Sequence, residues 1–253
     1  MDKNYSQLLE KLNNLKLNYA ATGLKLELET EIISTAEIDL AQKLTEESGL
    51  RLTLKTSGCS AVSDIFLSKA LGISNILSPM IESAYALEKF YENVKDIRTD
   101  KTPNLMFNIE TITAYENIDK VLNSKYIDSF STIVFGRNDF CRSLGKTADF
   151  CDDEIVFDYI CSVLQKIENT GLNLIVGGNI TPKSQDFLQK INSNKFTHFE
   201  TRKIVFDKKI LKEDFKKALQ DALEFELLWL ELKSFKNPLD EMRMDILKKR
   251  LAF

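Results

Sequence analysis

The chain has 253 residues, of which 43% are hydrophobic, and 34 Lys and Arg against 38 Asp and Glu give a formal net charge of −4. This composition is ordinary for a soluble globular protein, and α/β barrels often reach this length as one domain. No basic run or stretch of about 18 apolar residues occurs, so we expect a cytoplasmic protein with no nucleic-acid or membrane partner.

The thiol and imidazole groups argue against a disulfide framework and against zinc. The four cysteines, Cys59, Cys141, Cys151 and Cys161, form no CxxC pair, and the only histidine is His198. A chain of this size does not need disulfides, so reduced thiols are expected. No spacing matches that of a zinc site.

In chain order, an N-terminal helix is expected over residues 1–22, and short apolar runs then alternate with longer amphipathic segments. This alternation is typical of βα units around a parallel sheet. The first segment between strands has Ser34 as its N-cap, Glu37 as the capping-box partner and a stop at Gly49. The seven candidate strands cover residues 23–29, 50–55, 73–78, 104–110, 131–136, 172–178 and 197–206.

Regular βα alternation favours either a closed eight-stranded barrel or an open doubly wound sheet. No GxGxxG motif follows the first strand, which weakens the dinucleotide-binding version of the open sheet. We therefore predict a single domain, 1–253, with the α/β architecture of a (β/α)8 TIM-type barrel and its barrel core at 23–206. One strand is unassigned, and a degenerate first strand would account for it because the leading segment reads as helical.

After residue 210 the pattern changes to C-terminal helices, which occupy 210–253 and are interrupted near Pro238. Phe225, Leu228, Trp229 and Leu232 recur at spacings of three and four, so one helical face is expected to be buried. Packing on the chain's own barrel and contact with another subunit would each bury this face. The sequence leaves both open.

Charged residues follow several of the candidate strands, at the barrel end where the chemistry of this fold gathers. Glu29 ends the first strand, Lys55 the second and Glu110 the fourth, and Asp139 follows the fifth. Converging carboxylates repel one another unless a cation lies among them, and oxygen donors without His or Cys suit Mg²⁺ or Mn²⁺. Glu110 and Asp139 are therefore candidate metal ligands, although each alone could be solvated or cap a helix.

The stretch from 136 to 145 contains further candidates for substrate binding. Backbone N–H groups before a helix, together with the helix dipole, can hold a carboxylate or phosphate. Ser143 could add a hydroxyl, and Asn179 follows the two glycines that end the sixth strand. Arg137, Asn138, Ser143 and Asn179 are thus candidate substrate-binding residues, with a plain loop as the alternative.

The stretches "LTLKTSGCSAVSDI", "LMFNIETITAYENIDKVL" and "IVFGRNDFCRSLG" resemble the HpcH/HpaI aldolase and citrate lyase beta-subunit family of the phosphoenolpyruvate/pyruvate superfamily. The resemblance covers about residues 23–206. It implies a (β/α)8 barrel, a homo-oligomer in which a C-terminal helix is often exchanged, and Mg²⁺ or Mn²⁺ held at the positions of Glu110 and Asp139. The metal would bind a 2-oxo acid such as pyruvate and stabilise the enolate formed when a carbon–carbon bond breaks or forms.

Two positions depart from the family pattern. The family usually has Arg at the position of Lys55, and Lys keeps the charge but loses the bidentate fork. In the family, the strand that corresponds to the one ending at Glu29 usually reads like DLED or has a Glu followed by His, and that last residue assists proton transfer. Here Glu29 matches the Glu, but Thr30 follows it. A metal-bound water, Lys55 or Glu27 would then have to serve as the base.

We predict a metal-dependent carbon–carbon lyase, aldolase or citrate lyase-like, that acts on a 2-oxo acid or its aldol adduct, with Lys55 and Glu29 as catalytic residues. A lyase of CoA esters would belong to the same class, but no basic groove for the CoA phosphates is evident. A catalytically weak barrel that binds a small carboxylate, and a metal-dependent hydrolase of a related acyl adduct, are the alternatives.

Overall fold

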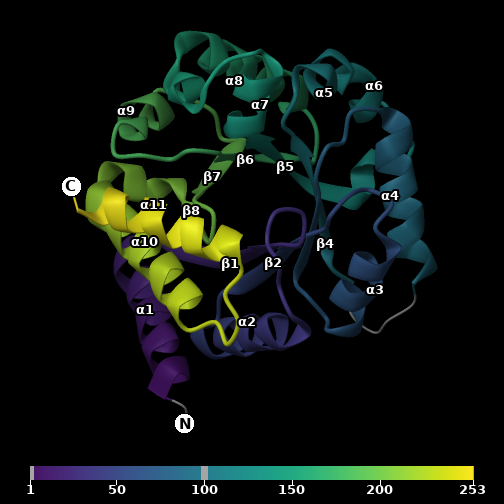
Figure 1. Cartoon of the computed structure of the whole chain (residues 1–253). Coiled ribbons are helices and arrows are strands. Elements are labelled where there is room, and N and C mark those ends of the chain that lie inside the picture. The colour runs from purple at the N-terminus through teal and green to yellow at the C-terminus, as the bar shows by residue number, and fades with distance from the viewer. Residues whose placement is uncertain (1–2, 98–101, 253) are drawn as a thin grey trace.

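The computed structural model describes residues 3–97 and 102–252, and in this part of the chain eight strands close into one barrel surrounded by helices (Figure 1). Neighbours around the barrel follow the chain order from β1 to β8, and β8 closes on β1. The predicted closed barrel is therefore confirmed. The strands are β1 Ala21–Glu27, β2 Arg51–Lys55, β3 Asn75–Ser78, β4 Asn104–Ile109, β5 Phe130–Gly136, β6 Asn173–Gly177, β7 Phe196–Glu200 and β8 Ile204–Asp207.

The last predicted strand, 197–206, folds as two strands instead of one. β8 runs antiparallel to both β7 and β1. In the connecting turn the Thr201 N–H donates to Ile204 O at 2.9 Å, and the Ile204 N–H donates to the Thr201 hydroxyl at 3.0 Å. The unassigned strand is thus the eighth and not a degenerate first strand. The turn could not be recognised from the sequence because it contains neither Gly nor Pro, the usual turn residues, and is closed instead by hydrogen bonds of Thr201.

The predicted capping box is present at the start of α2, where Ser34 accepts the Glu37 N–H, and Gly49 ends the helix with a φ of 65°. The first two residues of the predicted N-terminal helix and Phe253 lie outside the described residues. The helices are α1 Lys3–Tyr19, α2 Thr35–Ser48, α3 Val62–Ala70, α4 Ala84–Asp96, α5 Ile112–Glu116, α6 Ile118–Leu122, α7 Arg137–Ser143, α8 Glu154–Ile167, α9 Ser184–Gln189, α10 Phe215–Glu231 and α11 Pro238–Leu251. None of the described helices is both long and apolar enough to span a bilayer.

The interior of the barrel contains a small apolar layer with a polar cavity at each end. Val134 borders the cavity at the carboxyl end of the strands, whereas Met106, Ile175 and Val205 border the cavity at the amino end. This layer is separate from the main core between strands and helices. The layer is formed by Leu77, Met106, Val134, Ile175 and Val205.

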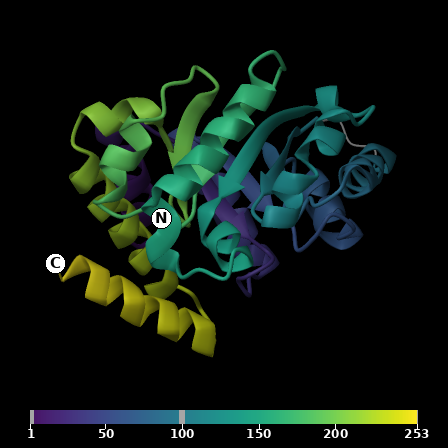
Figure 2. The same cartoon turned by 90° about the horizontal axis from the view of Figure 1, so that it is seen from above.

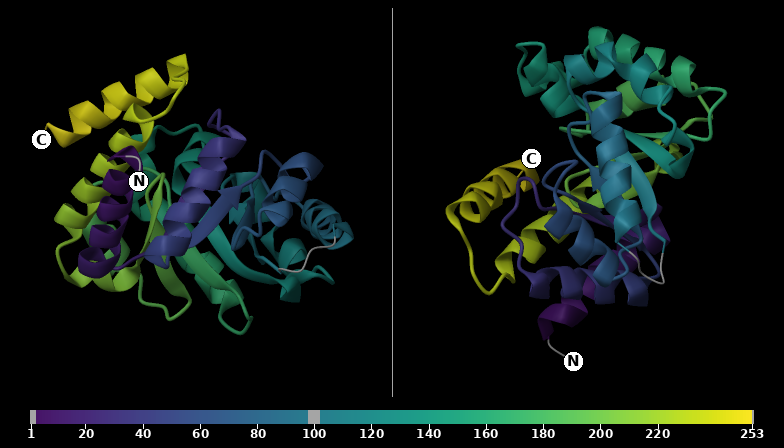
Figure 3. Two further views of the ribbon diagram at one scale, coloured as in Figure 1. Left: turned by 90° about the horizontal axis from the view of Figure 1, so that it is seen from below. Right: turned by 90° about the vertical axis from the view of Figure 1, so that its right-hand side faces the viewer.

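The apolar face predicted in the C-terminal region packs on the chain itself. Phe225 and Trp229 of α10 are 0% and 3% exposed, and Leu228 and Leu232 pack against the same core. Of the two alternatives for this face, packing on the chain's own barrel is therefore the one observed. The next helix, α11, lies across one end of the barrel, as the views from above and below show (Figures 2 and 3).

Candidate active site

A cavity of about 530 Å³ lies at the carboxyl end of the parallel strands. Side chains from β1, β2 and β4, from the segments after β5, β6 and β7, and from α11 line it. Three predicted residues, Arg137, Ser143 and Glu29, do not line the cavity, although Glu29 forms an ion pair with Lys55, which does. The predicted residues that do line it are Lys55, Glu110, Asn138, Asp139 and Asn179.

Glu110, directly after β4, is the most enclosed carboxylate of the site and is only 1% exposed. Its Oε1 accepts the Met80 N–H at 3.0 Å, and its Oε2 accepts Asn108 Nδ2 at 2.6 Å. Gly136 makes room for this carboxylate, because a Cβ there would lie 2.9 Å from Oε2. Burial raises the pKa of Glu110, although Lys55 and the two hydrogen bonds oppose the rise. A cation beside Glu110 would relieve this burial cost.

Lys55 supplies a fixed positive charge next to Glu110. Its Nζ lies 2.6 Å from Glu29 Oε2 and 3.4 Å from Glu110 Oε2, and the side chain is 7% exposed. Burial lowers the pKa of Lys55, but Glu110, Glu27 and Glu29 together raise it above its ordinary value. Lys55 therefore stays an ammonium group at neutral pH, which argues against it as the general base.

A second buried ion cluster, centred on Lys25, was missed from the sequence. Lys25 Nζ lies 2.5 Å from Glu200 Oε1 and 2.9 Å from Glu27 Oε1. Burial lowers the pKa of Lys25, but the two carboxylates raise it well above its ordinary value. Burial raises the pKa of Glu27. The charges of Lys25 and Lys55 outweigh this effect and hold the pKa of Glu27 far below its usual range. The available signal was Lys25 between two leucines in the first strand, on the same face as Glu27.

Asp139 lies in the first turn of α7 and lines the same cavity as Glu110. Its side chain is 39% exposed, and its Oδ1 is 3.6 Å from Arg142 Nη1. Asp139 thus adds a more accessible carboxylate to the enclosed one of Glu110.

The oxygen donors of this cavity fit a hard divalent cation. Besides the carboxylates of Glu110 and Asp139, the buried Oδ1 of Asn108 accepts no hydrogen bond from any described residue. Within residues 3–97 and 102–252 there is no group of three or more His, Cys, Asp or Glu side chains that could hold a metal. Mg²⁺ commonly binds one or two carboxylates and completes its shell with water and substrate oxygens. Two carboxylates are therefore sufficient for such a site.

Arg137 lies outside the cavity, so the structure does not support its predicted contact with substrate. It is 0% exposed and donates to the backbone oxygens of Gly177, Gly178 and Cys151 at 3.1, 2.7 and 3.0 Å. Its Nη1 also lies 2.5 Å from Asp152 Oδ1. These contacts occupy four of the five guanidinium donors. Arg137 therefore positions the segment after β6 instead of binding a ligand.

Ser143 also has a structural contact in place of the predicted one. Its hydroxyl donates to Phe140 O at 2.7 Å and accepts the Ile112 N–H at 2.8 Å. It thereby joins the end of α7 to the start of α5, two residues after Glu110. Ser143 therefore holds α7 and α5 together next to Glu110 and does not contact the cavity.

Asn138, in the first turn of α7, and Asn179, after β6, both line the cavity. Between them, Gly178 has a φ of 85°, and a Cβ there would lie 2.5 Å from the Asn138 backbone nitrogen. Only glycine allows this close approach. Asn179 Nδ2 donates to Ala148 O at 3.0 Å, which leaves the Asn179 carbonyl oxygen and the Asn138 side chain as groups able to orient a ligand.

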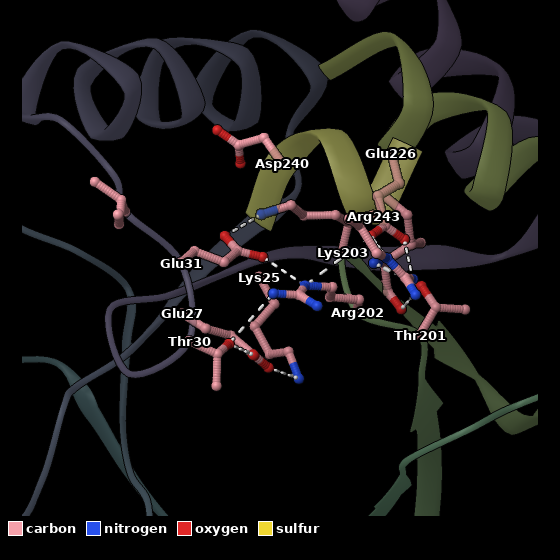
Figure 4. A network of polar contacts seen from close by, with 12 residues as sticks. Lys25, Glu27, Thr30, Glu31, Thr201, Arg202, Lys203, Glu226, Asp240 and Arg243 are labelled. Carbon is pink, nitrogen blue, oxygen red and sulfur yellow. Dashed lines mark hydrogen bonds and ion pairs between the residues drawn. The ribbon is translucent and has the colours of Figure 1, made fainter. Parts of the chain in front are cut away.

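A network of ion pairs connects Arg202 and Arg243, which line the cavity, to acidic residues of neighbouring segments (Figure 4). Glu31, after β1, lies 2.8 Å from Arg202 Nε and 2.5 Å from Lys203 Nζ in the turn between β7 and β8. Glu226 of α10, 1% exposed, accepts two hydrogen bonds from Arg243 of α11 at 2.6 and 2.9 Å. These contacts join four distant segments, so no local sequence signal indicated them.

The known proteins that this chain is similar to have the same architecture. The family described as HpcH/HpaI aldolase/citrate lyase matches residues 33–191. A solved HpcH/HpaI aldolase from Desulfitobacterium hafniense has 12% identity and a TM-score of 0.61, with 91% of each chain covered. An HpcH/HpaI aldolase/citrate lyase family protein from Burkholderia cenocepacia has 10% identity and a TM-score of 0.61, with 85% of this chain and 90% of that chain covered.

A further solved structure, the citrate synthase variant SbnG, has 14% identity and a TM-score of 0.57, with 86% of this chain and 89% of that chain covered. A search of curated protein sequences finds no significant match. The family match spans more than half of the chain, so the protein belongs to the HpcH/HpaI aldolase/citrate lyase family. The solved structures share its barrel fold.

Proposed function

We propose that the protein is a metal-dependent carbon–carbon lyase that acts on a 2-oxo acid or its aldol adduct. The observation that carries the proposal is the enclosed Glu110 carboxylate beside the Lys55 ammonium group, in one cavity with Asp139. Membership of an aldolase and citrate lyase family supports the reaction class. The aldolase and citrate synthase named among the structural neighbours agree with it.

Glu110 and Asp139 would hold the Mg²⁺ or Mn²⁺ ion, which when bound supplies Lewis-acid polarisation of the keto group. Lys55 stabilises the negative charge that develops on the enolate oxygen as the carbon–carbon bond breaks. Glu29 and Glu110 keep Lys55 charged and fix its position. Asn138 and Asn179 orient the substrate from the open side of the cavity.

Cleavage of an aldol adduct also requires a group that accepts the hydroxyl proton of the departing fragment. Glu27 is a weak base because its pKa is held far below the usual range, and Lys55 stays protonated. Glu29 has a side chain that is 22% exposed and contacts Lys55 directly. We therefore assign the proton transfer to Glu29, with water between it and the substrate.

We also propose that the chain forms a homo-oligomer through α11. Leu239, Met242 and Ile246 recur at spacings of three and four and are 56%, 62% and 47% exposed, and Phe235 before the helix is 75% exposed. Contiguous apolar side chains of this kind often mark contacts between proteins. Light scattering coupled to size-exclusion chromatography tests this, since a monomer at micromolar concentration would contradict it.

The decisive experiment for the reaction is exchange of the pyruvate methyl protons for deuterium, followed by NMR with and without Mn²⁺ or Mg²⁺. Wild-type protein is compared with Asp139→Ala and with the control Asp186→Ala, which alters an exposed aspartate outside the cavity. We expect exchange only with metal, lost in Asp139→Ala and retained in Asp186→Ala. Absence of both exchange and Mn²⁺ binding would contradict the proposal and favour a barrel that only binds a small carboxylate.

A further inference from the structure

The cavity at the amino end of the barrel, about 460 Å³ in volume, has no part in the proposed reaction. Small-molecule sites usually measure about 300–1,000 Å³, so its size is that of a binding site. Bulky branched side chains normally fill the interior of a barrel of this kind. Here glycine and short polar side chains line the amino end instead, and the cavity is the volume that bulkier ones would fill. From β1 to β6 they include Gly23, Thr53, Asn75, Asn104, Thr132 and Asn173.

On one side of the cavity, neighbouring strands join three of these side chains into a chain of hydrogen bonds. Thr53 lies opposite Asn75 in the strand register, and Asn75 lies opposite Asn104. Asn75 Nδ2 donates to the Thr53 hydroxyl, and Asn104 Nδ2 donates to Asn75 Oδ1, each at 3.0 Å. Among the described residues, the Thr53 hydroxyl donates to no group and Asn104 Oδ1 accepts from none. This wall therefore offers both a donor and an acceptor to a ligand.

The next two strands contribute a second polar pair, Thr132 and Asn173, which lie opposite each other in the register. The Thr132 hydroxyl has a neighbour on its own strand, the Ser131 hydroxyl at 3.2 Å. The side-chain amide of Asn173 makes no hydrogen bond within the described part of the chain. A polar group on a cavity wall costs stability unless water or a ligand satisfies it, so Asn173 is available for binding.

His198 adds a neutral acceptor to the same cavity. The Thr197 hydroxyl donates to Leu174 O at 3.5 Å, so its oxygen can accept from His198 Nδ1, which lies 2.9 Å away. Burial lowers the pKa of His198, which keeps the ring neutral at pH 7. With the proton on Nδ1, Nε2 is an acceptor.

Little free charge faces this cavity, and part of its lining is apolar. Its charged lining residues, among those described, are Arg51, which is exposed, and Glu200, which Lys25 holds at 2.5 Å. A charged ligand would therefore meet few opposite charges inside. The apolar part of the lining consists of Met106, Ile175 and Val205.

We propose that the amino-end cavity is a second binding site, which takes a neutral polyhydroxylated molecule of the size of a monosaccharide or a cyclic polyol. Hydroxyl groups both donate and accept hydrogen bonds, which matches a wall with available groups of both kinds. The C–H face of such a ring suits the apolar part of the lining. The inference does not depend on the proposed reaction, because Glu110 and Asp139 line the other cavity.

Saturation-transfer difference NMR tests the site with D-glucose, D-ribose and myo-inositol, and with cyclohexanol, which keeps a six-membered ring but only one hydroxyl. We expect at least one of the three polyols to bind with a dissociation constant of about 1 mM or less. We expect myo-inositol to bind more tightly than cyclohexanol. A preference for D-glucuronate over D-glucose that is lost in Arg51→Gln would support the site and add Arg51 to it.

Variants locate the bound polyol. Thr132→Val keeps nearly the same shape and should weaken binding about fivefold, the usual effect of losing one neutral hydrogen bond. Asn173→Leu fills part of the cavity and should abolish binding. The control Asn169→Leu alters an exposed asparagine outside the cavity, and Asp139→Ala alters the carboxyl-end cavity. Both should bind as wild type does.

The site would be overturned if wild type binds none of the three polyols, or if cyclohexanol binds as tightly as myo-inositol. Binding that neither Thr132→Val nor Asn173→Leu changes would also overturn it. Loss of binding in Asp139→Ala alone would place the polyol in the carboxyl-end cavity and contradict the proposal. If Asn173→Leu fails to fold, as thermal unfolding would show, the shape-preserving Thr132→Val still decides the test.

Discussion

The two ends of the barrel interior hold cavities of similar size, about 530 Å³ at the carboxyl end and about 460 Å³ at the amino end, but their chemistry differs. At the amino end, Arg51 and Glu200 are the only charged lining residues among those described, and neutral groups bond to one another: Asn104 donates to Asn75 and Asn75 donates to Thr53, each at 3.0 Å. At the carboxyl end, buried lysines and glutamates pair around Lys25 and Lys55. Buried charge is costly to maintain, so its concentration identifies the functional end better than cavity volume does.

The single histidine illustrates the same contrast. His198 lines the cavity at the amino end, where burial and Arg51 lower its pKa against the opposing charge of Asp207. A neutral imidazole at that end cannot serve chemistry at the opposite end of the barrel. The residue type most often used as a general base is therefore absent from the carboxyl-end cavity.

The largest expected effect comes from removing one charge at the functional end. Glu110→Gln should lower metal-dependent pyruvate exchange about a thousandfold, because loss of Lewis-acid polarisation removes several kcal/mol from transition-state stabilisation. His198→Gln, at the amino end, should stay close to wild type in the same NMR assay. A comparable loss in both variants would end the functional distinction between the two cavities.

Lys55→Met should lower the exchange rate about a hundredfold, the usual effect of removing one group that stabilises a developing oxyanion. Lys55→Arg keeps the charge and should recover part of the rate. Single-turnover kinetics with saturating Mn²⁺ would measure both variants. Equal rates for Lys55→Met and Lys55→Arg would show that the charge at this position has no role in the reaction.

Glu27→Gln tests the stability of the buried ions. At pH 7 it should lower the free energy of unfolding by about 3 kcal/mol, because Lys25 loses a buried partner. The folded-state pKa of Glu27 lies below its ordinary value of 4.5, so its contribution is complete above that value and is lost as pH falls below it. Urea unfolding at pH 7 and at lower pH should show the difference between variant and wild type shrinking. A pH-independent difference would contradict this account.

The smallest effect is expected at the residue that holds Glu110. Asn108→Ala removes the 2.6 Å hydrogen bond to Glu110 and the unsatisfied Oδ1. Affinity for Mn²⁺, measured by electron paramagnetic resonance, should fall about tenfold, as is usual when a partner of a metal ligand is removed. Unchanged affinity would show that Glu110 needs no support from β4.

Local patterns in the chain were enough to predict the barrel, the capping of α2 and the gathering of Lys55, Glu110 and Asp139 at one end. The reason is that strand and helix periodicity are encoded within a few residues, and the direction of parallel strands then sets which ends meet. Those same patterns could not show which way a side chain at a strand end would turn. Arg137 was thus predicted to bind substrate, whereas in the structure it donates to the backbone oxygens of Gly177 and Gly178.

Tertiary packing decided the remaining features. The antiparallel course of β8 depends on closure against β1, and the contacts of Lys25 with Glu200 and of Arg250 with Ile180 join residues 175 and 70 positions apart. Such pairs form only after strand pairing and helix docking have brought distant segments together. Burial of apolar surface drives this process, and the local sequence around each residue does not indicate it. The role of α11 at the mouth of the site could therefore be recognised only in the folded chain.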